Sequence, residues 1–130
     1  MKIEDHFKAY QQHRDAINWA IDRGLKNSQR IIGTHVSRAI VELFSALLHK
    51  LHLIDMGFQI NHRWLKSDKV SERFPDFPKK EVLMKRMVKL ELDAENLAYG
   101  AEKSEEEIKS ALLLFNEIEK MILEMMEKST

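Results

Sequence analysis

The stretch that decides the fold runs from residue 32 to residue 54 and reads IGTHVSRAIVELFSALLHKLHLI. Its apolar residues cover most of the circumference of a helix; they are Ile32, Val36, Ala39, Ile40, Leu43, Phe44, Leu47, Leu48 and Leu51. A helix that is apolar on most sides belongs in the middle of a bundle, because other helices must cover each face. We therefore predict that residues 32–54 form the central helix of an all-α protein.

Three further segments repeat apolar residues at the three- and four-residue spacing of amphipathic helices. The first covers residues 3–25. The second starts with Pro78 in its first turn and stops at Gly100, positions that suit proline and glycine. The third starts with Ser104 and Glu107, which have the spacing of a capping box.

Between residues 55 and 78 the helical pattern breaks, leaving a short helical segment near residues 60–66 and an extended connector that contains two prolines. The sequence therefore predicts an up-and-down bundle of four long helices plus this short segment. A chain of 130 residues fits one domain, which we place at residues 1–130.

The composition excludes several other classes. The chain has no cysteine, which rules out a disulfide scaffold, a thiolate zinc site and a cysteine nucleophile. Four glycines and two prolines are too few for a turn-rich β-sandwich. We see neither a run of about 18 apolar residues that would span a membrane nor an apolar signal-peptide core. We therefore expect a soluble, cytoplasmic protein without a membrane partner.

A narrow polar stripe interrupts the central helix. Its members follow one another at spacings of 3, 4, 3, 4 and 3 residues; they are His35, Arg38, Glu42, Ser45, His49 and His52. This spacing places all six along one side of the helix. The stripe is either the solvent-facing edge of the helix or a line of functional groups in a cleft. On the first helix, we expect His6 and His13 to lie on the surface.

Three chemistries would use such a stripe. A metal site in a bundle needs ligands such as a Glu-x-x-His pair from facing helices, and that motif is absent, so we expect no metal and no cofactor. Acid–base chemistry on RNA would use a histidine to move the proton and an arginine to stabilise phosphoryl charge. The candidates for that role are His35, Arg38, Glu42, His49, His62 and Arg63. The third use is assembly, in which polar pairs fix helix register or a dimer axis.

The zero net charge of the chain conceals a strong asymmetry. Residues 1–90 hold 17 basic against 10 acidic side chains, whereas residues 91–130 hold 4 against 11. Basic residues interleaved with aromatics contact single-stranded nucleic acid through phosphates and stacking. The candidates are Arg63, Trp64, Lys66, Lys69, Arg73, Lys79 and Lys80. Alternatively, the aromatics belong to the core and the lysines are solvated. A further alternative is that the acidic last helix pairs with the basic stretch within the chain or across a dimer.

The stretch from Gly33 to Ser67 resembles the second-helix region of HEPN domains. The resemblance rests on Ala39-Ile-Val-Glu42 with Ala46, on a turn at residues 53–57, and on His62-Arg-Trp-Leu65. The segment Asp93-Ala-Glu-Asn-Leu-Ala-Tyr99-Gly100, followed by a capped helix, is similar to the end of the same family's bundle. In all, the resemblance covers roughly residues 16–123.

The resemblance implies a helical homodimer of the prokaryotic cytoplasm, and many HEPN proteins are metal-independent ribonuclease toxins with a nucleotidyltransferase-like antitoxin. Their activity resides in an Arg-x(4–6)-His motif near the start of the penultimate long helix. Here Arg86 lies in that region, but no histidine follows His62. Arg30 and His35 have the spacing, but they stand at the start of the second helix, which is the wrong place for the motif. The catalytic motif is therefore not carried over.

We accordingly expect a HEPN-like, dimeric and non-catalytic interaction module that associates with RNA or belongs to a toxin–antitoxin pair. The enzyme alternative is a divergent metal-independent ribonuclease that uses His35 or His62 with Arg38 or Arg63. A metal-binding bundle is the weaker third alternative.

Overall fold

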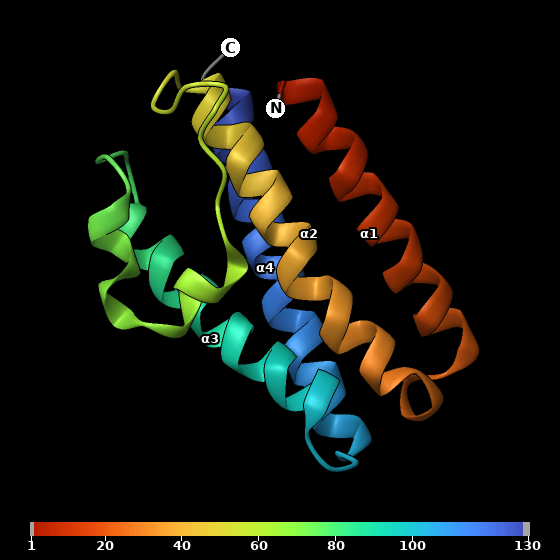
Figure 1. Ribbon diagram of the computed structural model, residues 1–130. Helices are drawn as coiled ribbons and strands as arrows, with labels where there is room; N and C mark the ends of the chain where they lie inside the picture. Colours follow the sequence, from red (N-terminus) through yellow and green to blue (C-terminus); the bar gives the residue numbers. More distant parts are fainter. Residues whose placement is uncertain (1, 129–130) are drawn as a thin grey trace.

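The computed structural model describes residues 2–128, except for the side chain of Asp68. Its long helices are α1 (Ile3–Arg23), α2 (Gln29–Lys50), α3 (Lys80–Tyr99) and α4 (Glu105–Lys128) (Figure 1). Three short 3₁₀ turns complete the described part: η1 (Leu25–Ser28), η2 (His62–Lys66) and η3 (Asp68–Arg73). No strand occurs in that part, so the predicted all-α bundle is confirmed. Residue 1 and residues 129–130 of the predicted domain lie outside it.

Helix α2 is the centre of the bundle, as the sequence predicted. It packs against α1, α3 and α4, and Figure 1 shows α1 and α3 on opposite sides of it with α4 behind. Ile32, Phe44 and Leu47 are fully or almost fully buried, like most of the other apolar residues of this helix. The core therefore lies around α2 rather than between equivalent helices.

The stretch Leu25–Lys50 has a mean hydropathy of 1.4 over its most apolar window, which by length and composition would suffice to cross a membrane. No other stretch in residues 2–128 passes this test. The expectation that no segment would be apolar enough to span a membrane is thus wrong. The polar stripe interrupts the apolar run, but the mean hydropathy of the window still meets the criterion for a membrane span. In the fold, 72% of that window is buried inside the protein.

The connector between α2 and α3 packs on the bundle through its aromatic residues. Phe74 is 5% exposed and meets the ring of Phe44 edge-on at 5.2 Å between centroids. The rings of Phe58 and Trp64 also pack against Phe74. Phe77 also lies against Phe44. The aromatics of the basic stretch therefore contribute to the core.

The helix ends follow the predicted signals in part. Ser104 accepts a hydrogen bond from the backbone N–H of Glu107, which confirms the cap of α4. The carboxylate of Glu107 accepts from the Ser104 hydroxyl rather than from its backbone N–H. Helix α3 begins at Lys80 and not at Pro78, because Lys79 takes a left-handed conformation with φ 65°. Helix α2 ends at Lys50, and His52 beyond it is left-handed with φ 58°.

Gly33 allows α2 and α3 to approach each other closely. A Cβ atom at this position would lie 2.5 Å from the backbone nitrogen of Ala98 and 2.8 Å from the carbonyl oxygen of Ala94. Because both neighbours belong to the backbone of a packed helix, neither has a side-chain rotamer with which to move aside. Only glycine fits this crossing without displacing α3.

We predict that Gly33→Ala lowers the free energy of unfolding by about 1–3 kcal/mol, the usual cost of overpacking a close contact. Alanine is the better helix former, so helix propensity alone would give the opposite sign. Urea denaturation followed by circular dichroism measures the change. Gly57→Ala is the control, because its Cβ would meet only the Asp55 carboxylate at 3.5 Å. Equal stabilities of Gly33→Ala and the parent chain would contradict the close crossing.

Candidate functional site

His35, Glu42 and His49 of the polar stripe meet α1, so this part of the stripe is neither a solvent edge nor an open cleft. His6 of α1 contacts the Glu42 carboxylate at 2.8 Å through Nδ1, and its ring stacks on His49 at 5.1 Å between centroids. His13 of α1 lies 2.9 Å from His35, Nδ1 to Nδ1. We call these five residues the histidine seam. Its contacts pair α1 with α2 within one chain.

The expectation that His6 and His13 lie on the surface is wrong. His6 is 3% exposed, and His13 is half-buried. The pattern on α1 alone marks both as polar edge positions, and only the packing shows that this edge meets the polar stripe of α2. Two members of the stripe do not meet α1 in this way, because Arg38 and His52 are exposed.

Burial in the seam lowers the pKa of three histidines. For His35, desolvation is the main cause, and the nearby His13 and Arg38 lower the pKa further. Desolvation also lowers the pKa of His13, with Glu42 opposing and Arg38 adding to the effect. Desolvation and the neighbouring His6 lower the pKa of His49, which Asp55 partly offsets. The folded protein therefore favours the neutral form of the imidazoles of His13, His35 and His49.

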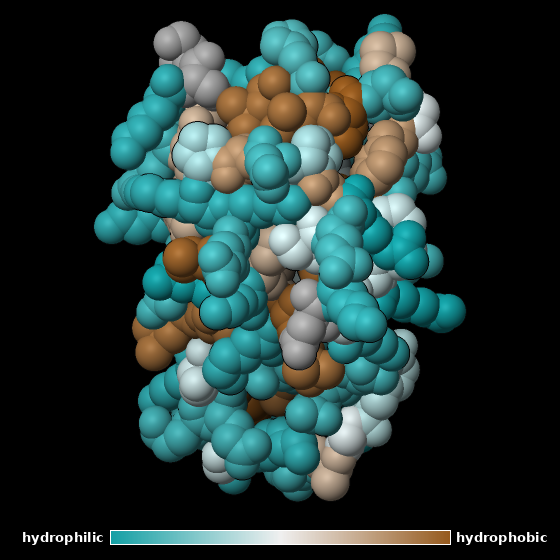
Figure 2. Space-filling view, turned by 90° about the vertical axis from the view of Figure 1, so that its left-hand side faces the viewer, coloured by the Kyte–Doolittle hydropathy of each residue, from teal (hydrophilic) through white to brown (hydrophobic). Residues whose placement is uncertain are grey.

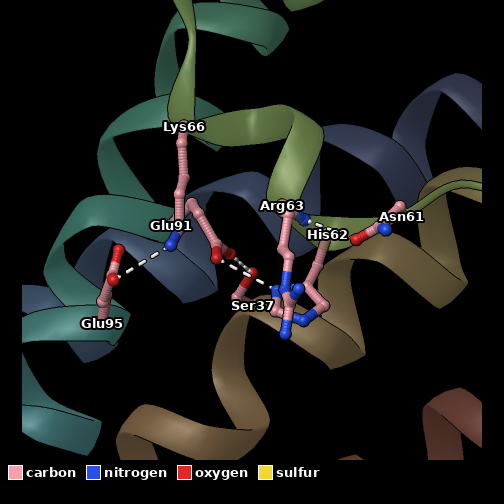
Figure 3. A network of polar contacts seen from close by, with 7 residues as sticks. All are labelled: Ser37, Asn61, His62, Arg63, Lys66, Glu91 and Glu95. Carbon is pink, nitrogen blue, oxygen red and sulfur yellow. Dashed lines mark hydrogen bonds and ion pairs between the residues drawn. The ribbon is translucent and has the colours of Figure 1, made fainter.

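A second group of polar residues lines a cleft of about 300 Å³ between α2, α3 and η2. At its centre the Glu91 carboxylate is 4% exposed. One carboxylate oxygen accepts a hydrogen bond from the hydroxyl of Ser37, and the other lies 3.1 Å from Nδ1 of His62. Figure 3 shows Ser37 of α2 and His62 of η2 converging on this carboxylate of α3. Three elements therefore meet at one buried charge.

The short turn η2 brings its basic residues to the same cleft. Asn61 caps the turn by accepting the backbone N–H of Arg63 at 2.9 Å, and Leu65 anchors it in the core. Arg63 and Lys66 then line the cleft together with Arg38 of α2. The Lys66 ammonium pairs with Glu95 at 3.0 Å (Figure 3). Three cations from two elements thus surround the His62–Glu91 pair.

This arrangement suits both anion binding and proton transfer. A carboxylate beside Nδ1 of an imidazole holds the N–H there and leaves Nε2 as the acceptor of a proton. Guanidinium groups at the cleft match the geometry of phosphate oxygens. His62 is thus placed to exchange a proton with an anion that Arg38 and Arg63 hold.

The catalytic candidates predicted from the sequence lie in two separate parts of the structure, the cleft and the histidine seam. Of the catalytic candidates, Arg38, His62 and Arg63 line the cleft, whereas the other three belong to the histidine seam. Arg30 and His35 also separate: Arg30 binds the carbonyls of Ala98 and Gly100, away from the seam. No group of three or more potential metal ligands clusters among the described residues.

The nucleic-acid candidates divide in the same way. Arg63 and Lys66 line the cleft, and Lys69 is exposed close to it in the chain. Arg73 lies over the half-buried ring of Trp64, 4.6 Å from its centroid. Lys79 and Lys80 line a separate hollow, where the Lys80 ammonium donates to the Phe74 carbonyl at 2.5 Å.

The face that η2, η3 and α3 form is mostly hydrophilic, with a hydrophobic patch near the top of Figure 2 and smaller hydrophobic groups below it. Among the described ion pairs, those of residues 66–89 involve Asp76, Glu81, Asp93 and Glu95. None of these carboxylates belongs to α4. Within the described chain, the acidic last helix therefore does not pair with the basic stretch.

Sequence reasoning missed Ser37 and Glu91 at the centre of the cleft. Glu91 follows Met87 by four residues and Leu90 by one, so it falls on the buried side of α3. A carboxylate inside an apolar stripe signals a buried polar contact, because its desolvation must be offset by partners. Ser37 lies outside the polar stripe of α2, and its partner becomes evident only in the fold.

The seam makes stability depend on pH. Unfolded histidines titrate near pH 6.5, whereas the folded state resists protonation of His13, His35 and His49. The unfolded state therefore binds more protons below this pH, so the stability present above pH 6.5 is lost as the pH falls. We predict a falling urea midpoint from pH 7.5 to pH 5.

The matched variants are His13→Gln/His35→Gln, which should flatten this pH dependence, and the exposed His52→Gln, which should leave it unchanged. A midpoint that rises on acidification in the parent chain would contradict the lowered pKa values.

At the cleft, we predict that Ser37→Ala lowers the free energy of unfolding by about 1–3 kcal/mol, because the buried Glu91 carboxylate loses a hydrogen-bond donor. Ser110→Ala on the exposed face of α4 should change it by less than about 0.5 kcal/mol. Thermal and urea unfolding of both variants give the comparison. Equal effects of the two substitutions would mean that Glu91 does not depend on Ser37.

Comparison of the chain with protein-family models, with curated proteins and with solved structures gives no match. Function must therefore be inferred from the chemistry of this chain's own residues.

Proposed function

We propose that the protein is an RNA-binding helical module and that the cleft between α2, α3 and η2 holds a phosphate of a single strand. The observation that carries this proposal is the convergence of Arg38, Arg63 and Lys66 beside His62 on one cleft. These residues come from two successive elements, α2 and η2, which residues 51–61 connect. A cluster of this kind concentrates positive charge where a polyanion can reach it.

The two arginines are the groups that would bind the phosphate. In the part of the chain that the structure describes, no carboxylate lies within ion-pair distance of either Arg38 or Arg63. The nearest acidic groups of the cleft are engaged, Glu91 with Ser37 and His62, and Glu95 with Lys66. An incoming phosphate therefore meets two guanidinium groups whose donors are not taken up by internal carboxylates.

The choice of RNA among polyanions rests on the resemblance of residues 16–123 to HEPN domains. On the same basis we propose a homodimer in the cytoplasm and a nucleotidyltransferase-like antitoxin as a partner. These parts of the proposal depend on the resemblance, whereas the phosphate site depends on the side chains of the cleft.

The contact between His62 and Glu91 favours a second candidate function, metal-independent cleavage of RNA. In this reaction Nε2 of His62 would take the proton of a ribose 2′-hydroxyl as its oxygen attacks the adjacent phosphorus. The 5′-oxygen of the next nucleotide would leave and take up a proton, and Arg38 or Arg63 would stabilise the phosphoryl charge. The products would be a 2′,3′-cyclic phosphate and a 5′-hydroxyl end.

We predict that Arg63→Ala weakens binding of a fluorescein-labelled RNA octamer about five- to tenfold at 0.1 M salt and flattens the salt dependence by about 0.7 in log–log slope, as the loss of one phosphate contact requires. Fluorescence anisotropy titrations at several salt concentrations measure both effects. Lys85→Ala removes one positive charge from the exposed surface of α3, outside the cleft, and is the matched control. Equal losses in the two variants would show that only overall charge matters.

Cleavage is tested with the same octamer in the presence of EDTA. The second function requires 2′,3′-cyclic phosphate products from the parent chain and their loss in His62→Ala, with binding retained. Intact RNA after incubation with the parent chain would leave binding as the function of the cleft.

A further inference from the structure

Tyr99 occupies an unusual position at the rim of the cleft. It is the last residue of α3 and is 79% exposed, the largest value among the exposed large hydrophobic side chains. It also lines the cleft with Arg38 and Arg63. A tyrosine usually buries most of its ring because the ring's apolar surface is large. An aromatic ring left in water beside a basic cleft therefore calls for a functional explanation.

The backbone that carries Tyr99 is held firmly by the start of α2. The side chain of Gln29 donates to the carbonyls of Leu97 and Ala101 at 3.2 and 3.1 Å. Arg30 donates to the carbonyls of Ala98 and Gly100 at 2.7 and 3.1 Å. Four carbonyls around the end of α3 are thus satisfied by two neighbouring side chains.

Two further contacts fix the same place. The backbone N–H of Lys103 donates to the Gln29 side chain at 2.7 Å, which ties down the chain that follows α3. The close crossing at Gly33 brings the backbone of α2 against Ala94 and Ala98. Tyr99 is therefore exposed on a well-anchored helix end and not on a frayed one. Its ring has only two side-chain torsions to fix on binding a ligand, so the entropic cost of ordering it is small.

We infer that Tyr99 is a stacking platform for one unpaired base of the RNA strand whose phosphate Arg38 and Arg63 bind. This inference rests on the proposed function and adds to it the class of RNA that the cleft would select. Aromatic side chains beside a basic groove bind single strands by stacking on the faces of successive bases. A base within a duplex is covered by its neighbours on both faces, so the platform favours single strands.

The test compares three probes of equal length: a fluorescein-labelled uridine octamer, an octamer of abasic ribose phosphates, and an eight-base-pair RNA duplex. Each strand carries the same number of phosphates, but only the first probe offers free base faces. The parent chain should bind the uridine octamer about tenfold more tightly than the abasic octamer, the scale of one stacked base. Tyr99→Ala should abolish this difference, and Tyr99→Phe should retain it.

The outcomes separate the inference from the function on which it rests. Equal binding of the uridine and abasic octamers by the parent chain, with a loss in Arg63→Ala, would overturn the stacking role and leave the phosphate site standing. A preference for the uridine octamer that survives Tyr99→Ala would overturn it as well. If the parent chain binds no probe, both proposals fail. If Tyr99→Ala instead changes only the oligomeric state in sedimentation, the ring belongs to a protein interface and the inference is wrong.

Discussion

Helix α2 must be covered on nearly every face, and this constraint organises the rest of the protein. Its apolar side chains are buried by α1, α3 and α4. Burial on this scale leaves several polar side chains of the helix with little access to water, and an unsatisfied polar group in such a place costs about 1–3 kcal/mol. These buried positions need partners, and His35, Ser37 and Glu42 find theirs on α1 and α3.

Three sets of contacts result from this requirement. Toward α1, His35 meets His13 and Glu42 meets His6, which gives the histidine seam. Toward α3, Ser37 meets the Glu91 carboxylate, which also positions His62 of η2. At its first turn, α2 closes the end of α3 through the side chain of Gln29. The cleft and its exposed rim are built on the second and third of these sets, so the functional site depends on the same packing as the core.

Much of the fold could be predicted from the sequence, because helical periodicity and caps are local signals. The central position of α2 and the cap at Ser104 are cases in point. The start of α3 was misplaced, because the left-handed residue Lys79 separates Pro78 from the helix. The candidate site was recovered in part. His62 and Arg63 stood out by residue type, but Glu91 and Tyr99 acquire meaning only when α3 is laid against α2 and η2.

Backbone amide chemical shifts of the ¹⁵N-labelled chain, followed as a single-stranded uridine octamer is added, test the central claim most directly. If the cleft binds the strand, the shifts that change will cluster in residues 33–38, 62–66 and 91–100, which meet only in the folded protein. Changes confined to residues 79–88, on the other side of the basic stretch, would contradict this account. So would an unchanged spectrum at a saturating RNA concentration.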